Sequence, residues 1–315
     1  MMTILYAVVA TIIGLFLLGW AGDRLVAGAA AAAKRFRVSE VFIGIIIVGF
    51  GTSLPEVVAT ATAAFAGNEQ LALGNIIGSN IANIGLILAA TLILTTRTDP
   101  LPHNRLDYLL MVGTLAVFTL TLILYGALTP PIGGLFLGGL IGYAWLSLRQ
   151  GQKAGKTGQE EGGEDYAQLT TGKMVFFIVA GLVGLILGAN LLIDGATTLA
   201  VLLGVPEKVI GITLVAVGTS LPELAAAIAA TRRGRLGIIV GNILGSNVFN
   251  VLAAAGVTSL ISPMMGAAFT LDLVVMMLLT IIAAPLFYHR RLVPFLAHGV
   301  GLLILYSGYT VWLFI

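Results

Sequence analysis

The sequence predicts an all-α polytopic membrane protein of ten transmembrane helices, arranged as two inverted five-helix repeats. The first observation is composition: 58% of the 315 residues are hydrophobic, only 10% are charged, and the mean hydropathy is +1.05. A soluble domain of this size has about 25% charged residues, so most of this surface must face lipid. The second observation is an internal repeat, because the peptide Gly51–Glu56 (GTSLPE) returns as Gly218–Glu223, 167 residues later.

A second pair of peptides keeps the same offset. Gly74–Asn83 (GNIIGSNIAN) returns as Gly241–Asn250 (GNILGSNVFN). Each copy places a glutamate, hydroxyls and amides in strongly apolar surroundings. An ionisable residue inside a membrane is costly and marks a functional site by default. Two such residues in repeated frames indicate a cation site where the two halves meet.

The apolar stretches can be divided into ten spans, since a spanning helix needs roughly 20 mainly apolar residues. The predicted spans are 3–33, 40–66, 71–95, 107–126 and 131–149, then 173–200, 207–231, 236–262, 271–288 and 293–314. The expected organisation is therefore a first repeat (1–149), a linker (150–172) and a second repeat (173–315). The first stretch has no basic residue before Trp20, so we interpret it as a retained helix rather than a cleaved signal.

The linker is glycine-rich and charged, so it cannot bury a core and is expected to be flexible. Its acidic residues, Glu160, Glu161, Glu164 and Asp165, lack the spacing of a dedicated calcium loop. A solvated linker is favoured over a regulatory cation site.

Basic residues concentrate in alternate connections between the predicted spans. The odd-numbered connections hold Lys34, Arg35, Arg37, Arg97, Arg105, Arg149, Lys153, Lys156, Lys173, Arg232, Arg233, Arg235, Arg290 and Arg291. The even-numbered connections and the termini hold only Lys208. The positive-inside rule places the odd connections and the linker in the cytoplasm and both termini outside the plasma membrane. Because each repeat has an odd number of spans, the second must be inverted relative to the first.

Proline interrupts the second and seventh predicted spans. Pro55 lacks an N–H group and its ring opposes the carbonyl of Gly51, four residues earlier. Pro222 and Gly218 repeat this arrangement. We therefore expect broken helices 2 and 7 at the midplane, with free carbonyls near Gly49 and Ala216. Irregular backbone at this depth must be buried in protein or line a wet cavity.

The repeated peptides and the predicted breaks supply only oxygen donors. The candidate side chains are Thr52, Ser53, Glu56, Ser79, Asn83, Thr219, Ser220, Glu223, Ser246 and Asn250. Oxygen ligands suit hard cations, and many ligands on a flexible backbone favour Ca²⁺ over Mg²⁺. The competing interpretation is structural: glycines allow close helix packing, amides bond across helices, and the glutamates stay protonated. For Asn75 and Asn242 the two interpretations are equally favoured.

The other polar residues do not indicate a binding or catalytic site. Asp23 and Asp194 are not repeat equivalents; we expect each to be interfacial or paired, for example Asp23 with the nearby Arg24 or Arg35. The absence of cysteine excludes disulfides and thiolate metal sites. The histidines have no ligand spacing, and no nucleophile–base constellation is present. We therefore expect neither an enzyme nor a cofactor.

The paired GTSLPE and GNxxGSN segments resemble the α-repeats of the calcium/cation antiporter superfamily, in particular prokaryotic sodium/calcium exchangers. The resemblance covers essentially the whole chain. It implies a secondary active antiporter that exchanges Na⁺ for Ca²⁺ by alternating access, with one Ca²⁺ site and several Na⁺ sites at its centre. It also implies that helices 1 and 6 slide across a rigid core.

The resemblance also implies a role for each matched residue. Glu56 and Glu223 would bind both Ca²⁺ and Na⁺, and Thr52 and Thr219 would offer backbone oxygens to Ca²⁺. Na⁺ would be bound by Ser53, Ser220, Ser79, Ser246 and the carbonyls of Gly49 and Ala216. Asn83 and Asn250 would be central amides or water-holding positions.

One position departs from a common pattern of that family. Many prokaryotic and potassium-dependent relatives have aspartate where this chain has Asn250. The asparagine resembles the potassium-independent branch and argues against K⁺ co-transport. It also limits the core to two carboxylates, nominally −2, so Ca²⁺ and Na⁺ should displace each other because buried net charge is costly.

Two other functions stay open. H⁺/Ca²⁺ (or other divalent cation) exchange could use the same two glutamates, although the many hydroxyl oxygens favour Na⁺. A passive channel is disfavoured, since paired broken helices at one midplane site are typical of an occluding carrier. The expected partners are the two ions and the lipid bilayer, without nucleic acid, and we expect a functional monomer.

Overall fold

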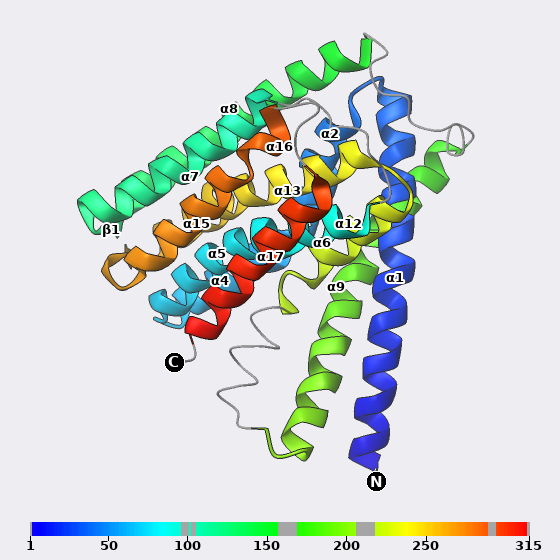
Figure 1. The fold of residues 1–315 in the computed structure, drawn as a ribbon, viewed down its shortest axis with the longest axis horizontal. Coiled ribbons are helices and arrows are strands. Elements are labelled where there is room, and N and C mark those ends of the chain that lie inside the picture. The colour runs from blue at the N-terminus through cyan, green and yellow to red at the C-terminus, as the bar shows by residue number, and fades with distance from the viewer. Residues whose placement is uncertain are drawn as a thin grey trace.

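The computed structural model describes residues 2–95, 101, 105–156, 169–205, 218–288 and 294–313, and these are almost entirely helical (Figure 1). The first half contains α1 (Met2–Phe36), α2 (Glu40–Ile43), η1 (Gly44–Gly49), α3 (Phe50–Thr52), α4 (Leu54–Phe65), α5 (Glu69–Ala82), η2 (Asn83–Leu88), α6 (Ala89–Leu94), α7 (Arg105–Tyr125) and α8 (Pro130–Lys156). The second half contains α9 (Thr171–Leu202), α12 (Leu221–Arg232), α13 (Leu236–Phe249), η5 (Asn250–Ala255), α14 (Gly256–Ile261), η6 (Ala267–Phe269), α15 (Thr270–Ile282), α16 (Ala284–Tyr288) and α17 (Phe295–Trp312). Two short strands, β1 (Ala127–Leu128) and β2 (Met264–Met265), pair antiparallel.

Nine helical runs within the described ranges are long and apolar enough to cross a membrane. Their bounds agree with nine of the ten predicted spans to within a few residues, except that α8 ends at Lys156 rather than at 149. The extension is held in place because Ser39 N–H donates a 3.0 Å hydrogen bond to the carbonyl of Gly151. The tenth predicted span, 207–231, is described only from residue 218 onward, where α12 forms its second part. Its first part, with Lys208 and Ala216, lies outside the described residues.

The internal repeat is visible element by element. The elements α4, α5, η2 and α6 begin and end 167 residues before α12, α13, η5 and α14, respectively. Asn83 opens the π-helical η2, and its repeat equivalent Asn250 opens the π-helical η5. Gly67 and Gly234 end the equivalent helices α4 and α12 with positive φ, 73° and 64°, a conformation that favours glycine. The inversion of the two halves across the membrane stays a prediction.

The helical run from residue 40 to 65 departs from α-geometry at two points. Its first part contains the π-helical η1, and Ser53 follows α3 with φ −84° and ψ 0° before α4 begins at Leu54. Ser220 has nearly the same angles, −90° and 7°, before α12. The proposed break of both helices at the membrane midplane stays a prediction.

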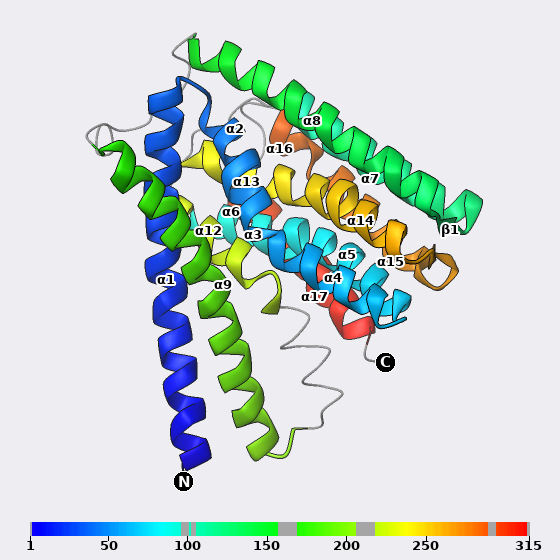
Figure 2. The same cartoon turned by 180° about the vertical axis from the view of Figure 1, so that it is seen from behind.

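The long helices α1 and α9 lie side by side, and the N-terminal part of α1 and the C-terminal part of α9 project beyond the other helices in both views (Figures 1 and 2). Glycines let their backbones meet: a Cβ on Gly14 would lie 2.5 Å from Leu192 N, and one on Gly181 would lie 2.7 Å from Leu25 N. Small residues at such interfaces are how membrane helices pack closely. Arg24 adds a cation–π contact with Phe177 of α9, at 4.9 Å from the ring centroid.

The expected partner of Asp23 was wrong. Its carboxylate pairs with Arg233, with 3.0 Å between Oδ1 and Nε, rather than with Arg24 or Arg35. The guanidinium of Arg24 instead lies over aromatic rings. Asp194 is paired, as expected, and accepts a hydrogen bond from the Tyr6 hydroxyl.

Candidate ion-binding site

The two glutamates of the repeated peptide lie in the first turns of α4 and α12. A proline, Pro55 or Pro222, precedes each of them in the first turn. Proline is tolerated there because the N–H groups of the first turn have no partner within the helix. Glu56 and Glu223 are only 1% and 2% exposed. Helix N-termini favour negative charge, so each carboxyl occupies a position suited to an anion although it is shielded from solvent.

Three contacts join the repeats around these glutamates. The Ser53 hydroxyl donates to Glu223 Oε1 at 3.1 Å. The Ser246 hydroxyl donates to the carbonyl of Gly49 at 3.2 Å. The Thr52 hydroxyl, which donates to the carbonyl of Val48 at 2.9 Å, also lies 3.4 Å from Asn242 Oδ1. Residues that are distant in sequence therefore form one polar cluster.

Glycines bring the helices that carry this cluster into backbone contact. A Cβ on Gly241 of α13 would lie 2.2 Å from the carbonyl oxygen of Val41, and one on Gly245 would lie 2.8 Å from that of Ile45. On the facing side, a Cβ on Gly49 would lie 3.0 Å from Ser246 N. Only glycine fits at these crossings, and the close approach brings Ser246 within reach of the Gly49 carbonyl.

Several buried polar atoms of the predicted site residues have no hydrogen-bond partner among the described residues. They include both carboxyl oxygens of Glu56 and the Oε2 atom of Glu223. The hydroxyls of Thr219 and Ser220, Nδ2 of Asn83 and Oδ1 of Asn250 are also without one. Burying unpaired carboxylates is very costly, and a hard cation bound by these oxygens would offset that cost.

The structure joins some of the predicted site residues and leaves others unlinked. Hydrogen bonds connect Gly49, Ser53, Glu223 and Ser246 across the repeats. Glu56, Ser79, Asn83, Ser220 and Asn250 are buried, and no hydrogen bond in the described part of the chain links their side chains to the cluster. Ala216 lies outside the described residues. The ligand roles of all these residues stay predictions.

Asn242 is a member of the cluster that the sequence left undecided. Its side chain is 1% exposed, its Nδ2 donates to the Glu223 carbonyl at 3.3 Å, and its Oδ1 faces Thr52. It therefore touches both repeats at the cluster. The recurrence of Asn75 at Asn242 was the only signal of this role, and that signal did not separate packing from function.

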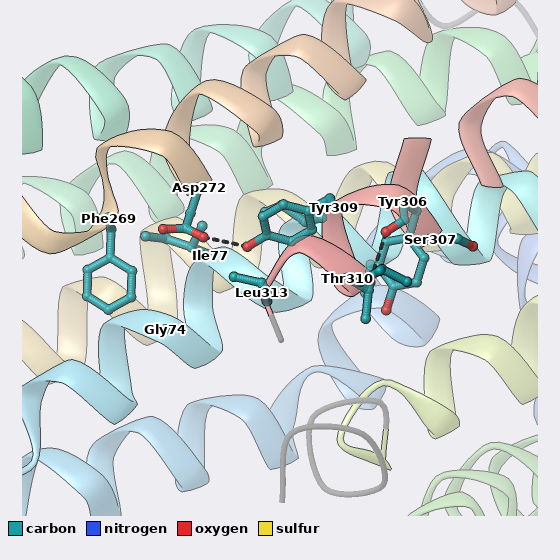
Figure 3. Close-up of a pocket in the computed structure, with 13 residues that line it drawn as sticks. Gly74, Ile77, Phe269, Asp272, Tyr306, Ser307, Tyr309, Thr310 and Leu313 are labelled. Carbon is teal, nitrogen blue, oxygen red and sulfur yellow. Dashed lines mark hydrogen bonds between the residues drawn. The ribbon is translucent and has the colours of Figure 1, made fainter. Parts of the chain in front are cut away.

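A cavity of about 460 Å³ lies elsewhere, between α5, α15 and α17 (Figure 3). Tyr309 donates a hydrogen bond to Asp272 on its wall, and Gly74 and Gly78 line the α5 side. The repeat equivalents of these glycines, Gly241 and Gly245, are where η1 packs on α13. The repeat equivalent of η1, residues 211–216, lies outside the described residues. We assign this cavity no ligand.

Comparison with known proteins places the chain among membrane transporters. A family model described as "Sodium/calcium exchanger protein" matches residues 6–149 and 173–315. The inner membrane protein YrbG of Escherichia coli K12 is 36% identical, with 98% of this chain and 96% of YrbG covered. The putative antiporter CaxA of Alkalimonas amylolytica is 37% identical, with 82% of each protein covered.

Solved structures of the sodium–calcium exchanger NCX_Mj share the whole fold. One of them, soaked with Na⁺ and Sr²⁺, superposes with a TM-score of 0.85 at 28% identity and covers 98% of both chains. The polytopic helical architecture predicted from the sequence is thereby confirmed, and the family model spans both halves around the buried glutamates. The chain belongs to the sodium/calcium exchanger family of membrane antiporters.

Proposed function

We propose that the chain exchanges Na⁺ for Ca²⁺ by alternating access and that the Na⁺ gradient drives Ca²⁺ out of the cell. The observation that carries this proposal is the pair Glu56 and Glu223. Both are buried, both occupy repeated frames, and three of their four carboxyl oxygens have no hydrogen-bond partner among the described residues. The hydroxyl, amide and carbonyl oxygens beside them complete a ligand set that suits hard cations.

The charge of the cluster supports exchange rather than co-transport. Asn83 and Asn250 are neutral, so the site residues assigned above contain two carboxylates, with a nominal charge of −2. One Ca²⁺ or two Na⁺ neutralise this charge, and a third Na⁺ leaves +1. Because uncompensated buried charge is costly, Ca²⁺ and Na⁺ binding exclude each other. Mutually exclusive binding is what antiport requires.

A second candidate is H⁺/Ca²⁺ exchange through the same glutamates. The unpartnered oxygens of Glu56 would carry protons when Ca²⁺ is absent. Ser53, Ser220 and Ser246 argue for Na⁺, because their hydroxyl oxygens are ligands that a proton carrier does not need.

The test is Ca²⁺ flux in proteoliposomes with pH clamped. Vesicles loaded with Na⁺ are diluted into Na⁺-free buffer containing ⁴⁵Ca²⁺, and the expected result is rapid uptake. Glu56→Gln and Glu223→Gln should each abolish it. Glu69→Gln is the matched control, since Glu69 lies at the start of α5 and accepts a 2.8 Å hydrogen bond from Ser262; this variant should retain uptake.

Two results would decide against Na⁺ coupling. Uptake that follows a pH gradient in Na⁺-free vesicles would establish H⁺ exchange instead. Uptake that is indifferent to both gradients, with single-channel conductance, would establish a channel.

The orientation has a separate test. The basic residues support a cytoplasmic linker and both termini outside the plasma membrane. The chain has no cysteine, so Met2→Cys, which precedes the first predicted span and is 85% exposed, introduces a single thiol near the N-terminus for an impermeant reagent. Labelling of intact cells supports the proposed orientation, and labelling only of inside-out vesicles contradicts it.

A further inference from the structure

The two repeats differ in whether a long helix covers them. On α12, Ala229 is 5% exposed because α1 packs against it. A Cβ on Gly22 of α1 would lie 3.0 Å from the Ala225 carbonyl oxygen and 3.3 Å from the Ala229 Cβ. The repeat equivalents of Ala225 and Ala229 on α4 are Val58, which is 63% exposed, and Thr62, also exposed. Thus α1 covers α12, whereas the equivalent face of α4 is uncovered.

An ion pair joins α1 to the covered side, and the repeat-equivalent residues on the other side cannot form one. Asp23 of α1 and Arg233, which follows α12, lie 3.0 Å apart, with side chains 48% and 28% exposed. Their repeat equivalents are Asn190 of α9 and Ala66, which follows α4, and both of these are exposed. An asparagine and an alanine cannot form an ion pair. The symmetry-related arrangement, with α9 against α4, would therefore lack this attraction.

If the two repeats are inverted, the difference in covering between α12 and α4 distinguishes the two access states of the protein. In proteins with inverted repeats, alternating access is largely a rigid-body movement of one bundle against the rest around a fixed site. A state in which α9 covers α4 and α1 leaves α12 is the counterpart of the one described above. The Asp23–Arg233 pair is made in the first state and broken in the second.

We propose that Asp23 and Arg233 are positioning residues that close the cytoplasmic side of the ion site and hold the protein in its outward-facing state. The assignment rests on the proposed function and on the proposed orientation, which puts Asp23 in the inner half of α1 and Arg233 at the cytoplasmic end of α12. Neither residue belongs to the polar cluster around Glu223. Together they set the equilibrium between the two access states.

The experiment measures opening of the cytoplasmic side without measuring transport. Because the chain has no cysteine, Ala229→Cys provides a single thiol beneath Gly22. An impermeant maleimide is applied to inside-out vesicles in Na⁺- and Ca²⁺-free buffer, and the labelling rate follows the fraction of molecules in which α1 has left α12. Asp23→Asn and Arg233→Gln should each raise the rate about two- to five-fold, the range expected for a partly exposed ion pair.

Two further variants separate this role from general stability. The exchange Asp23→Arg with Arg233→Asp reverses the pair and should restore the slow rate. Arg232→Gln removes the neighbouring, exposed positive charge and should leave the rate unchanged. Unchanged labelling in both single variants, or failure of the reversed pair to restore it, overturns the proposal. Since the readout needs neither ion, failure of Na⁺-driven flux would not alter it, so the two hypotheses fail separately.

Discussion

The Ser53 hydroxyl donates a 3.1 Å hydrogen bond to Oε1 of Glu223, so a residue of the first repeat stabilises the carboxyl of the second. The reciprocal relationship does not exist in the described part of the chain, because the hydroxyl of Ser220 and both carboxyl oxygens of Glu56 have no hydrogen-bond partner there. The pairs Ser53/Glu223 and Ser220/Glu56 are thus equivalent in residue type but differ in their hydrogen bonding. This asymmetry predicts that equivalent mutations have unequal effects.

Ser53→Ala should destabilise the ion-free protein more than Ser220→Ala does. The first substitution removes a hydrogen bond to a carboxyl, which is worth about 1.5–3 kcal/mol. The second removes a hydroxyl that has no hydrogen-bond partner in the described part of the chain. Thermal unfolding in detergent without Na⁺ or Ca²⁺ measures the difference. Equal losses in the two variants would contradict the asymmetry.

Ca²⁺ should protect the protein against heat, because an ion that binds only the folded state stabilises it. At a Ca²⁺ concentration of 100 times Kd the gain is about 2.7 kcal/mol. The gain should disappear in Glu56→Gln and in Glu223→Gln and persist in Glu69→Gln. Added Na⁺ should reduce it in the unmodified protein. Ca²⁺ protection that survives both glutamine substitutions would place the ion elsewhere.

Gly241→Ala should disrupt the ion-binding site indirectly, by changing how α13 packs against the helix that carries Val41. The new Cβ would lie 2.2 Å from the Val41 carbonyl oxygen, a backbone atom that cannot move alone. Such overpacking costs about 1–3 kcal/mol, and the displaced α13 would carry Ser246 away from Gly49. Thermal stability and flux should fall together. Gly142→Ala is the control, since the new Cβ would meet no heavy atom within 4 Å beyond the adjoining backbone of its own helix, and it should be neutral or slightly stabilising.

Much of the fold follows from local sequence properties. Long apolar runs predicted the helices, and the repeat offset holds to the residue for α4 through α6 against α12 through α14. Contacts between distant segments were not predictable in this way. Asp23 has Arg24 beside it in sequence and yet pairs with Arg233, because the packing of α1 on α12 decides which cation is near. The extension of α8 to Lys156 likewise depends on the turn at Ser39.

In the candidate site, too, some residues were predictable from local sequence and others were not. Repetition and proline placement identified Glu56 and Glu223, because those signals lie within each peptide. The sequence alone could not decide between packing and function for Asn242, since its role depends on Thr52 and on the Glu223 carbonyl meeting it from different segments.

Asn242→Ala should weaken ion binding more than Asn75→Ala does. Asn242 donates to the Glu223 carbonyl at 3.3 Å, whereas the Nδ2 of Asn75 is among the buried atoms with no hydrogen-bond partner in the described residues. Loss of one hydrogen bond that positions Glu223 is worth about 1 kcal/mol, so the half-saturating Ca²⁺ concentration should rise about five-fold. Ca²⁺ titration of flux in both variants measures it. An equal rise in the two variants would show that neither contact positions the glutamate.

Asn250→Asp tests whether the charge of the cluster sets the number of ions it binds. The side chain is 1% exposed and its Oδ1 has no hydrogen-bond partner among the described residues, so a carboxylate there adds a third negative charge at nearly constant shape. The nominal charge becomes −3, which three Na⁺ neutralise and one Ca²⁺ does not. The Na⁺ dependence of Ca²⁺ uptake should become steeper, and bound Ca²⁺ should be accompanied by a monovalent cation or a proton. Asn250→Ser, which keeps an oxygen without the charge, is the matched control and should leave the steepness unchanged. Identical Na⁺ dependence in the aspartate and serine variants would show that buried charge does not determine the stoichiometry.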